Sequence, residues 1–144
     1  MRISIASDHA GFEQKQLLVQ YLRDGGYEVA DLGPDSDDRV DYPDFAEAVA
    51  RDVAAGASRF GVLVCGTGIG MAIAANKVRG IRAGNVVSAE FAALSREHND
   101  ANVVTLSGRF VSPDENRRIL DAFLTTPFGE GRHAERVRKI DAID

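Results

Sequence analysis

A single cysteine, Cys65, stands where an apolar run meets three closely spaced glycines. The run 60–65 has the composition of a buried strand, and the segment 71–76 beyond the glycines has a helical composition. In such a strand-turn-helix unit, backbone N–H groups gather at the helix N-terminus and stabilise negative charge. The same dipole would favour the thiolate form of Cys65. The segment therefore predicts an active-site loop that combines an acid–base or nucleophilic group with an anion hole.

The glycine loop does not match the commoner phosphate-binding motifs. A nucleotide P-loop requires Gly-Lys-Ser/Thr, but Gly70 is followed by Met71. A dinucleotide fingerprint requires Gly-x-Gly-x-x-Gly, whereas the glycines at 66, 68 and 70 are spaced by two throughout. A cysteine phosphatase would need an arginine where Met71 stands, and a receiver-type regulatory module would need an aspartate where Cys65 stands. We therefore expect neither ATP, GTP nor NAD, and no phosphatase chemistry.

Three histidines, His9, His98 and His133, lie far apart without the His-x3-His or Cys-x2-Cys spacing of common metal sites. We predict no metal and no cofactor. His98 comes at the end of a helix expected over 88–97, where an imidazole often only caps backbone carbonyls. Local sequence thus leaves a structural role for His98 open beside a chemical one.

Length and composition favour one domain over residues 1–144. The chain is 44% hydrophobic, which is enough to bury a core without disulfides. Its net charge of −5 argues against general nucleic-acid binding. No apolar run approaches the roughly 20 residues that span a bilayer, so we expect no membrane partner. One cysteine, with no basic leader before a long apolar segment, favours the cytoplasm.

Short apolar runs alternate with segments of helical periodicity along the chain. One helical stripe joins Phe45, Val49 and Val53, which are spaced by four. Such alternation predicts an α/β fold, in which helices cover both faces of a parallel sheet and ligands bind beyond the carboxyl ends of its strands. The expected strands are 3–6, 27–32, 60–65, 81–87 and 103–106.

A last helix is expected over about 132–143, after a glycine-rich break. Val137 and Ile140 lie on one side of it. Arg132 and Arg136 project together from another side, because they are four residues apart. An isolated pair of this kind is ordinarily a solvated charged face, so the arginines acquire a role only from the rest of the chain.

Six motifs extend from the first expected strand to the last helix. They are SDHAG (7–11), DYP (41–43), CGTGIG (65–70), AANK (74–77), EHNDANV (97–103) and GRH (131–133). Together they closely resemble the ribose-5-phosphate isomerase B family. The resemblance implies a doubly wound three-layer α/β/α sandwich, with a Rossmann-like, five-stranded, mainly parallel sheet. It also implies a homodimer or dimer of dimers with sites at the subunit interface, and we expect the last helix to pack on a neighbouring subunit.

The chemistry implied by this resemblance is the interconversion of ribose 5-phosphate and ribulose 5-phosphate through an enediolate, which needs a positioned base and an oxyanion site. Cys65 would be the base, and the Thr67 hydroxyl would hold the oxyanion together with the loop amides. His98, assisted by Asp8, would open the furanose ring. His9, Arg132 and Arg136 would bind the phosphate. The full set of expected substrate-binding residues is Asp8, His9, Tyr42, Gly66, Thr67, Gly68, Ile69, Gly70, Asn99, Arg109, Arg132 and Arg136.

The resemblance leaves the sugar open. Some family members use a glutamate farther along the loop, but here Cys65 is present and position 69 is Ile69, which indicates the cysteine-based subgroup. Allose 6-phosphate, galactose 6-phosphate and tetrose phosphates are alternative substrates. A noncatalytic sugar-phosphate sensor on the same fold is a further alternative, although it would have little need for Cys65, Thr67 and His98 together.

Overall fold

The computed structural model describes residues 1–144 and contains one five-stranded sheet. The strands are β1 (Arg2–Ser7), β2 (Glu28–Asp31), β3 (Phe60–Cys65), β4 (Ala83–Asn85) and β5 (Val103–Ser107). The helices are α1 (Phe12–Asp24), α2 (Tyr42–Ala54), α3 (Ile69–Ala75), α4 (Ala89–Asn99), α5 (Pro113–Thr125) and α6 (Arg132–Asp141). The sheet order is β2-β1-β3-β5-β4, and every neighbouring pair is parallel. The predicted α/β fold with a five-stranded parallel sheet is confirmed.

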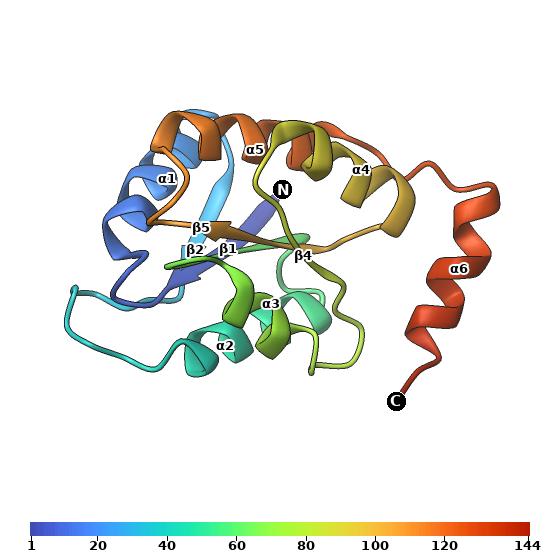
Figure 1. The fold of residues 1–144 in the computed structure, drawn as a ribbon, viewed down its shortest axis with the longest axis horizontal. Helices are drawn as coiled ribbons and strands as arrows, with labels where there is room; N and C mark the ends of the chain where they lie inside the picture. The colour runs from blue at the N-terminus through green and yellow to red at the C-terminus, as the bar shows by residue number, and fades with distance from the viewer.

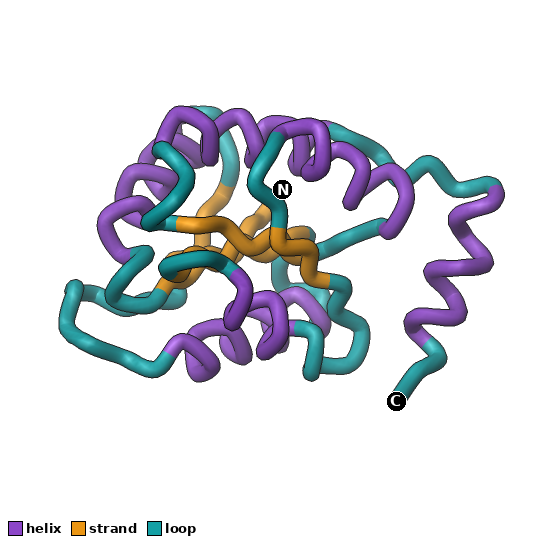
Figure 2. Tube along the Cα trace, viewed as in Figure 1, coloured by secondary structure: helices purple, strands orange, loops and turns teal.

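Helices cover both faces of the sheet, as Figures 1 and 2 show. The face under α1, α4 and α5 buries Val62 and Val64 of β3 in one apolar core. The face under α2 and α3 buries Leu63 and Cys65 of the same strand in a second core. Successive side chains of a strand point to opposite faces, so the alternation along β3 directs the Cys65 side chain toward α2 and α3.

The order of the strands reverses between β1 and β3. From this point the chain builds β2 on one side and β5 with β4 on the other. In open parallel sheets, ligands bind outside the carboxyl ends of the strands at such a switch point. Asp8 follows β1 and Cys65 ends β3, so the fold brings two of the expected site residues to this position.

Two strands are shorter than the sequence predicts. The segment 81–87 forms only three residues of strand, because β4 lies at the sheet edge and pairs with β5 alone. The side chain of Asn102 accepts the Arg82 amide at 2.8 Å, so a side chain takes the place of a ladder bond before β4. Likewise β2 is an edge strand and covers 28–31 instead of 27–32.

Helix α6 stands beside the rest of the molecule instead of covering a sheet face (Figures 1 and 2). It ends at Asp141, two residues before the expected end. Val137 is buried within its own chain, whereas Ile140 is 44% exposed, so Val137 does not require a neighbouring subunit to cover it. Arg82 also binds Asp141 at 2.8 Å, which ties the end of the helix to the segment before β4.

Candidate active site

Cys65 is the last residue of β3, directly before the glycine loop, and its side chain is almost fully buried. It is 5% exposed, and its Sγ accepts a hydrogen bond from the Gly68 amide at 3.1 Å. Gly68 has a φ of 84°, and a Cβ there would collide with the side-chain oxygen of Asn85. Glycine is therefore required at this turn, since it adopts a positive φ without strain and lets the amide approach the sulfur. The resulting N–H to sulfur contact stabilises negative charge on Cys65.

Other donors of the loop are free to bind a ligand. The amides of Gly66 and Thr67 donate to no acceptor within the chain. The Thr67 side chain is exposed, and its Oγ1 accepts the Ile69 amide at 3.1 Å, which orients the hydroxyl at the start of α3. Free backbone N–H groups with an oriented hydroxyl make an arrangement suited to a developing oxyanion.

The loop after β5 holds the glycine loop in place. The Gly108 amide donates to the Cys65 carbonyl at 2.8 Å, and the Ser107 hydroxyl donates to the Gly66 carbonyl at 2.7 Å. The Arg109 amide donates to the same Gly66 carbonyl at 3.2 Å, and its exposed side chain lies over Gly66. These contacts place a guanidinium beside the loop that carries Cys65.

Asp8 and His9 follow β1, the strand that pairs with β3, and so lie near Cys65. The Asp8 amide donates to the Val64 carbonyl at 3.1 Å, and the Asp8 carboxylate accepts the Gly11 amide at 2.9 Å. Asp8 is only 7% exposed. His9 Nδ1 accepts the Val40 amide at 3.3 Å, which leaves Nε2 to carry the proton of a neutral ring and to donate to a ligand.

The structure places the expected site residues in two separate groups. The first group gathers at the carboxyl end of the sheet and comprises Asp8, His9, Tyr42, Gly66, Thr67, Gly68, Ile69, Gly70 and Arg109 around Cys65. Tyr42 belongs to it because its ring lies directly against Gly70. The second group comprises His98 and Asn99 at the end of α4, with Arg132 and Arg136 on α6.

These two groups lie near opposite ends of the strands. Asn102, which follows α4, accepts the Gly61 amide at 3.0 Å at the start of β3, whereas Cys65 ends that strand. Four steps of a parallel strand cover roughly 13 Å. Figure 1 shows the same arrangement, with α6 beside the end of α4 and away from the loops that follow β3 and β5. Cys65 and His98 of one chain therefore do not meet.

The three arginines expected to bind the substrate, of which Arg132 and Arg136 are expected on the phosphate, form no ion pair within the chain. The third is Arg109. All three side chains are exposed. A guanidinium without a carboxylate partner retains its forked donors for an incoming phosphate.

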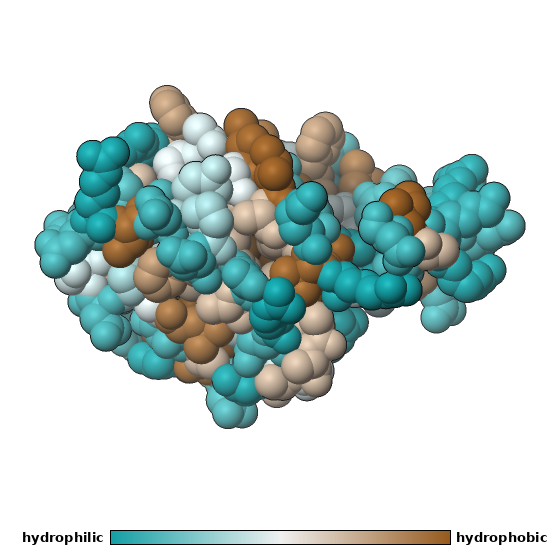
Figure 3. All heavy atoms as spheres, turned by 90° about the horizontal axis from the view of Figure 1, so that it is seen from below, coloured by the Kyte–Doolittle hydropathy of each residue, from teal (hydrophilic) through white to brown (hydrophobic).

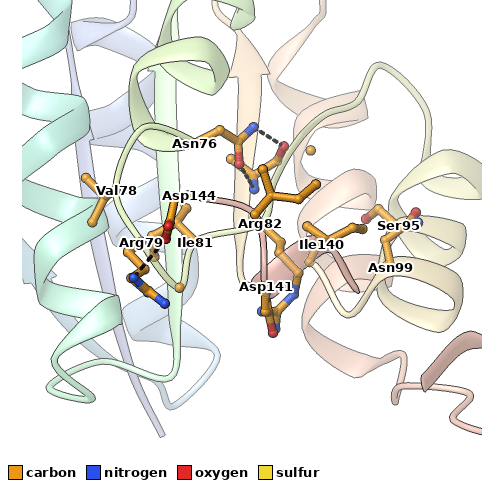
Figure 4. Close-up of a pocket in the computed structure, with 15 residues that line it drawn as sticks. Asn76, Val78, Arg79, Ile81, Arg82, Ser95, Asn99, Ile140, Asp141 and Asp144 are labelled. Carbon is orange, nitrogen blue, oxygen red and sulfur yellow. Dashed lines mark hydrogen bonds and ion pairs between the residues drawn. The ribbon is translucent and has the colours of Figure 1, made fainter. Parts of the chain in front are cut away.

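A cavity of about 450 Å³ lies elsewhere, between the C-terminal end of α6, α4 and the segment before β4 (Figure 4). Among the expected site residues only Asn99 lines it. Its arginines are already paired, Arg79 with Asp144 at 3.1 Å and Arg82 with Asp141 at 2.8 Å. The cavity thus lacks both the thiol and the free cations that the expected chemistry needs, so the glycine loop is the better candidate although it is an open surface.

The sequence missed one residue of the second group. His133 stacks on His98 with ring centroids 4.4 Å apart and an interplanar angle of 16°. From the sequence, His133 has no expected role in the site, and the signal that could have indicated one is its place in the Gly-Arg-His motif next to Arg132. No group of three His, Cys, Asp or Glu side chains is placed to hold a metal ion. No helix is long and apolar enough to cross a bilayer.

The chain matches the family model described as Ribose/Galactose Isomerase over residues 3–140. It is 49% identical to the probable ribose-5-phosphate isomerase B of Mycoplasma pneumoniae, with 99% of this chain and 94% of the relative covered. It is 46% identical to ribose-5-phosphate isomerase B of Escherichia coli, with 99% and 96% covered.

Solved structures agree with the sequence matches. A ribose 5-phosphate isomerase from Thermotoga maritima superimposes with a TM-score of 0.97 at 48% identity, covering 99% of this chain and 98% of the other. Ribose-5-phosphate isomerase B from Mycoplasma genitalium, solved with bound ribulose-5-phosphate, gives a TM-score of 0.94 at 47% identity, covering 97% and 93%. These matches, together with the doubly wound sheet and the cysteine loop at its switch point, identify an aldose–ketose isomerase of the α/β class. Within that class, the chain belongs to the ribose-5-phosphate isomerase B family.

Proposed function

We propose that this protein interconverts D-ribose 5-phosphate and D-ribulose 5-phosphate through an enediolate, at a site completed by a second copy of the chain. The observation that carries the proposal is the Cys65 thiol held under the Gly68 amide in a loop with free N–H donors. The family to which the chain belongs and the ribulose-5-phosphate bound to the Mycoplasma genitalium relative support the choice of substrate.

Cys65 is the base of this mechanism. Its thiolate takes the proton from C2 of the open-chain aldose and returns it to C1. The C2 hydroxyl gives its proton to the oxygen on C1, so that C1 becomes an alcohol and C2 becomes the carbonyl. The negative charge that develops on oxygen is held by the amides of Gly66 and Thr67 together with the Thr67 hydroxyl. Because Cys65 is buried, water competes little for its thiolate.

A second copy supplies the other half of the site. His98 opens the furanose ring and Arg132 and Arg136 bind the phosphate, but all three lie at the end of the sheet opposite to Cys65 of their own chain. A two-fold dimer brings the second group of one chain to the first group of the other, and repeats the arrangement at a second site. The proposed assembly is a homodimer or a dimer of dimers.

Exposed apolar side chains beside the first group support this assembly. Ile69 and Ile73 project from α3 with 54% and 64% of their surface exposed, and Phe110, next to Arg109, is 78% exposed. Figure 3 views the molecule from the side of α2 and α3, where apolar patches appear between hydrophilic residues. Large apolar side chains gathered around a polar site are typical of a surface that another protein covers.

The proposed setting is the pentose phosphate pathway in the cytoplasm. The single cysteine is unpaired, which suits a reducing compartment and leaves the thiol free for acid–base work. The proposed mechanism uses no metal or other cofactor, since backbone amides and a hydroxyl hold the oxyanion.

A panel of aldose phosphates tests this function. Ribose 5-phosphate should give the highest kcat/KM, above allose 6-phosphate, galactose 6-phosphate and a tetrose phosphate. A higher kcat/KM for a hexose or tetrose phosphate would show that the protein is an isomerase with a different preferred substrate. If no sugar phosphate is isomerised although one binds, the chain is a sensor and the proposed function is lost.

A further inference from the structure

The stacked pair of His98 and His133 is not explained by phosphate binding or by the oxyanion loop. The two rings are nearly parallel and lie 4.4 Å apart between centroids. Both residues are only half-buried, so the contact is not forced by a surrounding core. A flat ring laid over another restricts the rotation of both side chains.

The backbone before α6 is shaped to make this contact. The Gly129 amide donates to the Glu97 carbonyl at 2.9 Å, which docks the connecting segment on the last turn of α4. Glu130 and Gly131 then have φ values of 53° and 52°. A positive φ is unfavourable for a residue such as Glu130, so the backbone is locally strained at this turn. That turn sets His133 over His98.

The charges around the pair are mostly positive. Partial loss of hydration lowers the pKa of His133 below its ordinary value, and the neighbouring His98, Arg132 and Arg136 lower it further. Glu97 on α4 opposes them. Protonation of His133 is therefore disfavoured, and its ring lies on His98 as a neutral, flat group.

We propose that His133 is a positioning residue for His98: its ring fixes the plane of the His98 imidazole. This inference rests on the proposed function, in which His98 opens the furanose. In that step a proton leaves the C1 hydroxyl, the bond between C1 and the ring oxygen breaks with its electrons on that oxygen, and the ring oxygen takes up a proton. A neutral imidazole accepts one proton and donates another, whereas a protonated imidazole can only donate.

Two substitutions separate positioning from packing. His133→Phe keeps a flat ring on His98 but removes the titrating group, and His133→Ala removes both. His133→Ala should lower kcat for ribose 5-phosphate by about tenfold to a hundredfold with little change in KM, because a misoriented imidazole costs rate. His133→Phe should keep kcat within about threefold of the wild type at pH 8, where imidazoles are neutral. Arg138→Ala, an exposed cation on the same helix, is the matched control and should behave as the wild type.

A pH profile separates the flat ring of His133 from its titrating group. Because protonation of His133 is disfavoured, its imidazole is neutral at working pH, and His133→Phe should leave the acid limb of kcat/KM where it lies in the wild type. Two kinetic results overturn the proposal: wild-type kinetics in both variants, or an equal loss of kcat in both.

An NMR titration of the three histidines tests the pair without turnover. The His133 midpoint should lie below that of an ordinary imidazole in the wild type and should rise in His98→Phe, because coupling between two titrating groups is reciprocal. An unchanged His133 midpoint in His98→Phe overturns the proposal. If the wild type fails to isomerise any sugar phosphate, the proposed function falls, and the NMR midpoints still decide whether the pair is coupled.

Discussion

Cys65 is placed so that one group can serve two adjacent carbons. It ends a fully buried strand, so its backbone is held by the sheet, while its sulfur faces the loop and accepts the Gly68 amide. A thiolate on such a rigid support has one position relative to a bound sugar. The same residue is therefore able to take a proton from one carbon and return it to the next.

Replacing Cys65 with alanine tests this role. Cys65→Ala should lower kcat by about 10²–10⁴-fold, the usual contribution of a positioned acid–base group. Because the side chain is small and the strand is held on both edges, the melting temperature and the binding of inorganic phosphate should change little. Near-normal turnover would reject Cys65 as the base. NMR can follow the exchange of the substrate's C2 proton with solvent. Loss of this exchange in the variant would assign the defect to proton transfer.

Arg136 should act on binding more than on chemistry. Its guanidinium has no carboxylate partner in the chain, so Arg136→Ala removes a phosphate contact without leaving a buried charge behind. A charge-assisted hydrogen bond of about 1.5–3 kcal/mol corresponds to a rise in KM of roughly tenfold to more than a hundredfold. Arg138→Ala, on the same helix, provides the control. A KM that does not change in Arg136→Ala would remove this arginine from the phosphate site.

At the scale of elements, local sequence patterns predicted those helices, strands and turns whose structure depends on residues close together in the sequence. The strand into Cys65, the glycine turn and α3 follow from hydrophobic runs and glycine spacing, and the structure reproduces them. The length of β4 was overestimated because it depends on having a neighbour on one edge only, which no local pattern encodes. The contact of His98 with His133 was missed because α5 intervenes between them in the sequence.

An ion pair between the buried Lys15 and the partly exposed Asp31 supports the segment that orients His9. Lys15 on α1 is 1% exposed, and its Nζ binds the Asp31 carboxylate and the Pro34 carbonyl, each at 2.8 Å. These bonds hold the segment that leads to Val40, whose amide orients the His9 ring. Lys15 is thus a clamp between α1, the end of β2 and the first group of the site.

Removing the carboxylate tests the clamp. Asp31→Asn leaves the buried ammonium of Lys15 without its counter-charge, so the free energy of unfolding should fall by about 2–4 kcal/mol. Urea denaturation measures this change, and Asp35→Asn, in the exposed loop that follows, is the control. A loss no greater than in the control would show that Lys15 is stabilised chiefly by the Pro34 carbonyl.

For the whole molecule, the separation of the two groups decides how the site is built. One chain holds the proposed base and oxyanion donors at the carboxyl end of its sheet, and the histidine and two arginines proposed for ring opening and phosphate binding near the other end. In the proposed mechanism, neither group alone completes the reaction on a cyclic sugar phosphate. Each site then needs two chains, and activity should depend on association.

Mixing two inactive variants tests this account most directly. Cys65→Ala and His98→Asn chains are combined in equal amounts under conditions that exchange subunits, and exchange is verified by mass spectrometry of the intact assembly. If Cys65 and His98 of different chains share a site, each mixed dimer has one site with both residues intact. Random exchange should then restore about a quarter of wild-type activity, since about half of the dimers are mixed and each has one working site of two. Verified exchange with activity no higher than the average of the two variants would contradict the shared site.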